Sequence, residues 1–66
     1  MDKVKLLEVI KESGYKREFI AKKLGLTTYG LAKKINGESE FKCSEAKNMI
    51  DVLNMPRDLA FNIFLT

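Results

Sequence analysis

The sequence predicts a compact all-α domain of five short helices, and two observations favour this class. Apolar residues recur at helical spacing, most clearly at Ala46, Met49, Ile50 and Leu53, which fall at i, i+3, i+4 and i+7. No stretch of useful length alternates apolar with polar residues as a half-buried β-strand does. Because the chain has only 66 residues, we expect a single domain over residues 1–66 with one small core.

Local start and stop signals place the helices. They cover about residues 2–13, 16–24, 28–35, 43–53 and 57–64. Asp2 can cap the first helix, and Gly14 ends it. Within it, Leu6 and Ile10 form an i,i+4 apolar pair, which Val4 joins.

The second and third helices have the features of two helices packed at a steep angle across a short turn. Ala21 is small and allows a close approach, and Gly25 can take a left-handed conformation where the second helix stops. Thr27 can cap the third helix. Three leucines supply the apolar wedge between the helices: Leu24, Leu26 and Leu31.

Turn residues separate the later elements. Asn36 and Gly37 form a strong turn signal that ends the third helix. The fourth helix carries the apolar stripe described above. Pro56 suits the first turn of the fifth helix, where its missing N–H would have no helical partner.

The segment FIAKKLGLTTYGLAKKIN, residues 19–36, resembles the helix-turn-helix of the Cro/lambda-repressor-like (XRE-type) DNA-binding family. The run KKINGESEF is similar to that of short phage-associated regulators. The resemblance covers nearly the whole chain and implies a lambda-repressor-like domain with its helix-turn-helix at about 16–36. It implies a sequence-specific double-stranded DNA-binding transcriptional regulator, of the phage or prophage repressor type. The recognition helix, about 28–35, would then enter the major groove.

Positive charge is concentrated in the same part of the chain. Residues 15–37 carry six lysines and arginines against one glutamate, a net charge of +5, whereas residues 38–66 carry −2 and the whole chain +3. Such a field steers a protein toward a polyanion. A solvated helix face is the simpler interpretation of a charge run, and for Lys22 and Lys23 it stays open.

The outer side of the third helix supplies the expected base contacts. Leu31 and Ile35 must face inward, because they are its only large apolar pair at i,i+4. The candidates for base contacts are then Thr28, Tyr29, Ala32 and Lys33. Hydroxyls and lysine can bond base edges, and alanine can touch a thymine methyl group. For Tyr29 the alternative is a ring packed over the domain edge.

A second set of residues is expected to touch phosphates. The N-terminus of the second helix carries the positive end of the helix dipole, and Arg17 matches the family position that commonly touches a phosphate. The candidates are Lys16, Arg17, Thr27, Lys34, Asn36 and Lys42. Such contacts fix position without reading sequence. For Asn36 the alternative is a purely structural turn residue.

Three features depart from the family pattern. Lys34 falls where the wider family has an apolar core residue, and we expect Ile35 to take over that role. Gly30 costs a short helix about 1 kcal/mol relative to alanine, and it either admits a DNA backbone or loosens the helix. Lys42 stands three residues before Glu45, where relatives have a capping Ser or Thr, so the capping box is incomplete.

The C-terminal run LAFNIFLT is unusually apolar. A lone domain can bury Leu59 and Ile63, but not also all three of Phe61, Phe64 and Leu65 on the same face. Surplus apolar surface on a small protein suggests a partner, so we expect these three residues to contribute to a weak homodimer on a palindromic operator. The alternative is that all three pack in the core.

Several function classes fit poorly. The chain has no histidine, so we expect no metal site, and its tyrosines and single cysteine, Cys43, have no visible base partner. We therefore expect no enzyme, no catalytic residue, no cofactor and no small-molecule ligand. No apolar run approaches the ~18 residues of a membrane span, and the N-terminal sequence lacks a signal-peptide core, so we expect a cytoplasmic protein without membrane association.

One other function stays open. The acidic final third and the Phe-rich end are also typical of a helical protein-interaction module, antirepressor-like or antitoxin-like, that does not bind DNA. A protein partner, found together with no DNA shift at low salt, would distinguish this module from a regulator.

Overall fold

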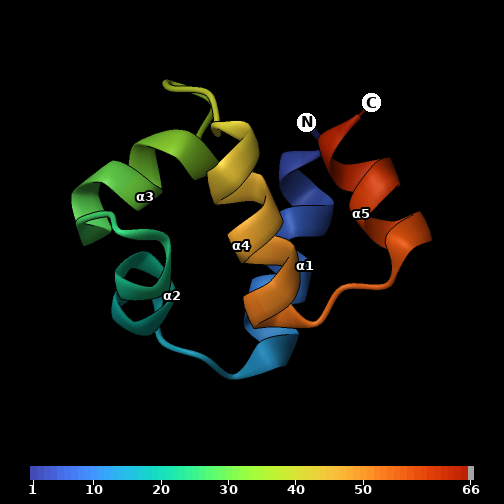
Figure 1. Cartoon of the computed structure of the whole chain (residues 1–66), viewed down its shortest axis with the longest axis horizontal. Helices are drawn as coiled ribbons and strands as arrows, with labels where there is room; N and C mark the ends of the chain where they lie inside the picture. Colours follow the sequence, from blue (N-terminus) through green and yellow to red (C-terminus); the bar gives the residue numbers. More distant parts are fainter. Residues whose placement is uncertain (66) are drawn as a thin grey trace.

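A computed structural model describes residues 1–65 and contains five α-helices and no β-strand in that range. The helices are α1 Lys3–Ser13, α2 Arg17–Leu24, α3 Thr28–Ile35, α4 Cys43–Leu53 and α5 Arg57–Phe64. In Figure 1, α4 crosses the middle of the molecule, with α2 and α3 on one side and α1 and α5 on the other. The all-α class and the five expected helices are confirmed, with bounds that agree to within one residue.

The helix ends form as the local signals predict. The Asp2 carboxylate accepts a hydrogen bond from the Lys5 N–H at 3.1 Å, and the Thr27 hydroxyl accepts one from the Gly30 N–H at 3.0 Å. Gly25 ends α2 with φ 72°, in the left-handed region where a side chain is strained. Helices α1 and α2 each begin one residue later than expected, because Asp2 and Lys16 are the cap residues that precede them.

The core draws at least one fully buried side chain from every helix: Leu6, Ile20, Leu31, Ile35, Met49 and Ile63. Helix α4 packs against α2 and α1, and α2 packs against α3. The radius of gyration is 10.5 Å, close to the ~10.8 Å expected of a compact chain of this length. Val4, expected beside the Leu6–Ile10 pair, is instead 66% exposed, because it lies on the outer side of α1.

Two contacts outside the helices close the globule. Met55, which follows α4, is buried in the core, and its N–H donates to the Ile50 carbonyl at 3.0 Å. The Asp2 N–H donates to the Ile63 carbonyl at 2.7 Å and ties the start of the chain to α5. The start of the chain accordingly lies near the last turn of α5 in Figure 1. None of the five helices has the length and apolar character that crossing a membrane requires.

Candidate nucleic-acid interface

Helix α3 presents one side to the core and the other to solvent. Leu31 and Ile35 are both fully buried, as expected of the only large apolar i,i+4 pair in this helix. On the outer side, Tyr29 is 73% exposed, and Thr28, the first residue of the helix, is exposed as well. Figure 1 places α3 at the periphery of the molecule, beside α2 and the upper end of α4. The N-terminal half of α3 is therefore open to a partner.

Tyr29 and Lys33 form a pair on this outer side. The Lys33 ammonium lies 5.5 Å from the centroid of the Tyr29 ring, within the range of a cation–π contact. The ring is exposed rather than packed over the domain edge. Ala32 and Lys33 are half-buried, so part of each side chain is accessible. All four residues expected to contact bases thus reach the surface of one short helix.

Gly30 sits in the first turn of α3, next to the cap. A Cβ atom added there would lie 3.2 Å from the Thr27 hydroxyl oxygen, slightly closer than ordinary van der Waals contact. No atom of another helix comes within 4 Å of that Cβ position. The position is therefore tight only against its own cap, and this cap residue is exposed and able to shift.

Most of the residues expected to touch phosphates are exposed: Lys16, Arg17, Thr27, Asn36 and Lys42. Lys16 precedes α2 without forming a side-chain cap, so no side chain occupies the first N–H groups of this helix. Asn36 ends α3 in a helical conformation, with its N–H bonded to the Ala32 carbonyl at 2.9 Å, while its side chain stays exposed. Its backbone thus forms the turn, and its amide group is at the surface.

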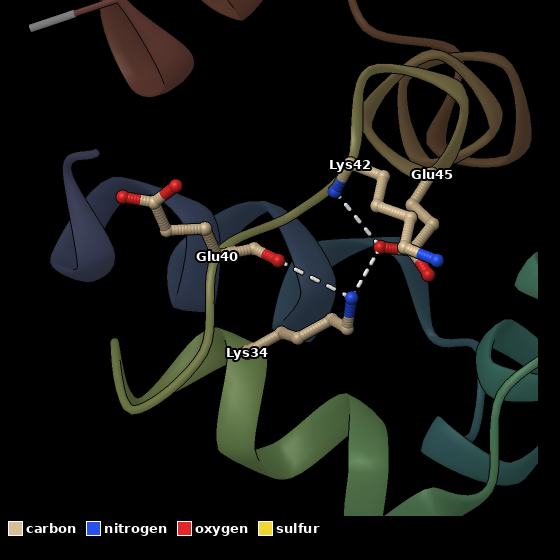
Figure 2. A network of polar contacts seen from close by, with 4 residues as sticks. All are labelled: Lys34, Glu40, Lys42 and Glu45. Atoms are coloured by element: carbon tan, nitrogen blue, oxygen red, sulfur yellow. Dashed lines mark hydrogen bonds and ion pairs between the residues drawn. The ribbon is translucent and has the colours of Figure 1, made fainter.

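Lys34 differs from the other five. Its side chain is only 11% exposed, and its ammonium forms an ion pair with the Glu45 carboxylate. The same ammonium donates to the Glu40 carbonyl at 3.2 Å. Figure 2 shows Nζ held between these two oxygens, with the carboxylate of Glu40 directed away from it. This ammonium is therefore bound within the protein and is not directed at solvent.

Glu45, expected from the sequence only as a capping-box residue of α4, also binds the Lys34 ammonium, and this second role was not predicted. It is only 8% exposed, and one of its carboxylate oxygens also accepts the Lys42 N–H at 2.8 Å. The hydrogen bond from Lys34, followed by that from the Lys42 backbone, lowers the pKa of Glu45 below its ordinary value of 4.5, although burial opposes the shift. The signal that points to it is Lys34 itself, because a lysine at an apolar position needs an acidic partner.

The capping box of α4 is incomplete, as expected, because only one of its two hydrogen bonds forms. Glu45 accepts from the Lys42 backbone, as the third helical residue of a capping box does. Lys42 makes no side-chain cap in return, because an ammonium has no acceptor. One carboxylate therefore serves both as the partner of Lys34 and as the reciprocal cap of α4.

An aromatic and cationic cluster covers the outer side of α2. The Tyr15 and Phe19 ring centroids are 4.9 Å apart, and the Lys23 ammonium lies 5.4 Å from the Phe19 centroid. Tyr15 is 46% and Phe19 is 41% exposed. Lys23 is exposed and has an aromatic neighbour within cation–π range, and a solvated helix face stays an alternative for it.

The C-terminal apolar residues divide between core and surface. Phe61 is 58% and Leu65 is 69% exposed. Phe64 is half-buried and packs edge-on against Phe41, with the two ring centroids 5.8 Å apart. A surface groove of about 600 Å³ lies between the end of α5 and the loop before α4, and Phe41, Phe64 and Leu65 line part of it. The three residues do not all pack in the core, and apolar surface remains at this end.

Among residues 1–65 no group of three or more acidic or cysteine side chains is placed to hold a metal ion. Cys43, the only cysteine, begins α4 and is exposed as a free thiol. In comparisons with known proteins, no family model matches this chain, and no curated protein or solved structure gives a significant match.

Proposed function

We propose that this protein is a sequence-specific double-stranded DNA-binding regulator of the Cro/lambda-repressor-like helix-turn-helix type. The observation that carries the proposal is the arrangement of α3. Two fully buried residues, Leu31 and Ile35, fix which side of the helix faces the core. The opposite side presents the exposed Tyr29 phenol and the Lys33 ammonium, and the exposed Thr28 hydroxyl lies at the N-terminal end of the helix, the end that approaches base edges in this mode of binding.

Base reading is assigned to the outer side of α3. Thr28 and Lys33 can bond base edges, and Ala32 can touch a thymine methyl group. Tyr29 can stack on a sugar or a thymine methyl and bond through its hydroxyl. Its ring also lies against Lys33, so the two side chains would read adjacent positions together. The proposed activity is binding alone and needs no catalytic group, metal or cofactor.

Phosphate contacts are assigned to the exposed residues on either side of α3: Lys16, Arg17, Thr27, Asn36 and Lys42. The uncapped start of α2 adds backbone N–H groups and the positive end of the helix dipole. Lys34 is left out of this set, because its ammonium is bound to Glu45 and Glu40. The net charge of +5 over residues 15–37 supplies long-range attraction to DNA.

We propose further that the regulator acts as a weak homodimer on a palindromic operator. The exposed Phe61 and Leu65, with Phe64 at the adjoining groove, supply the apolar surface that a second copy would cover. A two-fold dimer would place two α3 helices about one DNA turn apart.

Selection of bound sequences from random double-stranded DNA tests the proposal, followed by titration of the selected and random duplexes at several salt concentrations. We expect affinity for the selected duplex to fall steeply with salt, because bound lysines and arginines displace counterions. Arg17→Ala should weaken binding to all duplexes and reduce the salt slope by about 1. Tyr29→Ala and Lys33→Ala should change which sequence is preferred, whereas Lys47→Ala on the exposed side of α4 should do neither.

Equal, weak binding of selected and random duplexes would refute the regulator. The exposed apolar surface at Phe61 and Leu65 keeps a second function in view, a helical module that binds another protein and no DNA. Capture of a defined protein partner through this end, with no DNA shift at low salt, would favour that module.

A further inference from the structure

The Lys34–Glu45 ion pair joins the last turn of the proposed recognition helix to the first turn of α4. Both side chains are about nine-tenths buried, at 11% and 10% exposure. Each partner has a second hydrogen bond, from the Lys34 ammonium to the Glu40 carbonyl and from the Lys42 N–H to Glu45. Figure 2 shows one connected network that spans the end of α3, the loop that follows it and the start of α4.

The two fully buried residues of α3, Leu31 and Ile35, are one turn apart and lie on nearly one line along the helix, which packs against α2 and α1. A further contact away from that line restrains rotation of the helix about the line more than the two residues do alone. Lys34 precedes Ile35 by about 100° around the helix axis, and its anchor is therefore off the line.

Glu45, which binds the Lys34 ammonium, lies on the inner side of α4. Glu45, Met49 and Leu53 are buried residues of α4 at i, i+4 and i+8, so they share the inner side of this helix. Met49 is fully buried in the core. A carboxylate held on this side of α4 gives Lys34 a fixed point, and its second bond to Lys42 N–H orients it.

We infer that Lys34 and Glu45 are positioning residues, which set the roll of α3 against α4 and so aim Thr28–Lys33 at the DNA bases without touching DNA themselves. This inference rests on the proposed function. It assigns to Lys34 a role different from the phosphate contact that the sequence suggests.

Glu45→Gln gives a test in which the sign of the effect decides. Removing a negative charge from a DNA-binding protein strengthens attraction to phosphates, so electrostatics alone predicts tighter binding. Loss of positioning predicts the opposite for the selected duplex, about tenfold weaker binding, with random-duplex affinity unchanged or slightly higher. Asp51→Asn is the matched control, because it makes the same charge change at an exposed site on α4.

Lys34→Met separates positioning from phosphate contact. A positioning lysine predicts weaker binding to the selected duplex with an unchanged salt slope. A reduction of the slope by about 1 would show that Lys34 contacts a phosphate and would overturn the inference. All titrations are made at a temperature and pH at which urea curves show each variant to be folded, so that lost stability does not count as lost affinity.

Amide hydrogen exchange in the absence of DNA gives an independent readout. We expect faster exchange across α3 in Glu45→Gln than in Asp51→Asn, beyond the change in global stability. If the wild-type protein shows no sequence preference, the proposed function fails, and the exchange data still decide whether the pair holds α3. Equal exchange in the two variants, or unchanged discrimination between duplexes in Glu45→Gln, would overturn the inference.

Discussion

Replacing Lys34 with methionine should lower the free energy of unfolding by about 2–3 kcal/mol at pH 7. Methionine has nearly the length of lysine but no charge, so it leaves the Glu45 carboxylate buried without its cation. Removing one partner of a fully buried pair costs about 3–5 kcal/mol. Both side chains here keep about a tenth of their exposure, and Lys42 N–H still bonds the carboxylate, so the expected loss lies at or below the lower limit of that range.

The double variant Lys34→Met, Glu45→Gln supplies the decisive comparison. It removes both charges, and a neutral pair of similar volume commonly costs little, so we expect a loss within about 1 kcal/mol of wild type. Because Lys34→Met alone should cost more than the double variant, the two positions should be coupled by at least about 1 kcal/mol in a double-mutant cycle, to which any loss in Glu45→Gln alone adds. For a domain of this length the whole stability is only about 3–10 kcal/mol, so urea denaturation resolves such differences.

The pH dependence follows from the lowered pKa of Glu45. Because folding lowers this pKa below 4.5, the native state favours the charged carboxylate, and the stabilisation is complete above that value. This stabilisation is lost as the pH falls through the folded-state pKa. The difference in the free energy of unfolding between wild type and Lys34→Met should therefore shrink below pH 4.5. Additive single-variant losses at pH 7, or a gap that stays constant down to pH 3, would refute the reasoning. Lys47→Met, on exposed α4 surface, is the control for the loss of a cation.

Three other changes give expected outcomes. Gly30→Ala should raise the free energy of unfolding by about 0.5–1 kcal/mol in urea denaturation, because alanine has the higher helix propensity and the exposed Thr27 hydroxyl can move away from the added Cβ, 3.2 Å distant. A lower free energy of unfolding would show that the Thr27 cap is rigid. Met55→Ala should cost about 2 kcal/mol, whereas Val4→Ala, at an equally apolar but exposed site, should stay within about 0.5 kcal/mol; equal losses would contradict the assigned burial. Phe61→Ser should shift sedimentation toward monomer at high concentration while leaving the urea midpoint nearly unchanged, and an unaltered distribution would remove this face from the dimer.

Local signals were sufficient for the helices. Gly14 and Gly25 end helices because a left-handed residue is needed there, and Thr27 caps because its hydroxyl reaches the Gly30 N–H three residues on. These interactions span at most a few residues, so the sequence states them directly. The inward side of α3 was predictable for the same reason, since only Leu31 and Ile35 fit the helical period.

The placement of charge depended on contacts between distant residues. Lys34 and Glu45 lie on different helices, and nothing within either helix shows that a carboxylate meets the ammonium in a nearly buried site. Met55 likewise follows a helix at a position that looks like a linker, and its burial depends on how α4 and α5 pack.

By itself, then, the sequence determined where each helix begins and ends and which side of α3 turns inward, because caps, glycines and helical period act over a single turn. The tertiary structure decided which lysines remain free for a partner. The choice between an exposed cation such as Lys16 and a bound one such as Lys34 depends on whether another helix brings an acidic group within hydrogen-bond distance. A buried charge without such a partner strongly destabilises the folded state, so a lysine is buried only where an acidic group binds it.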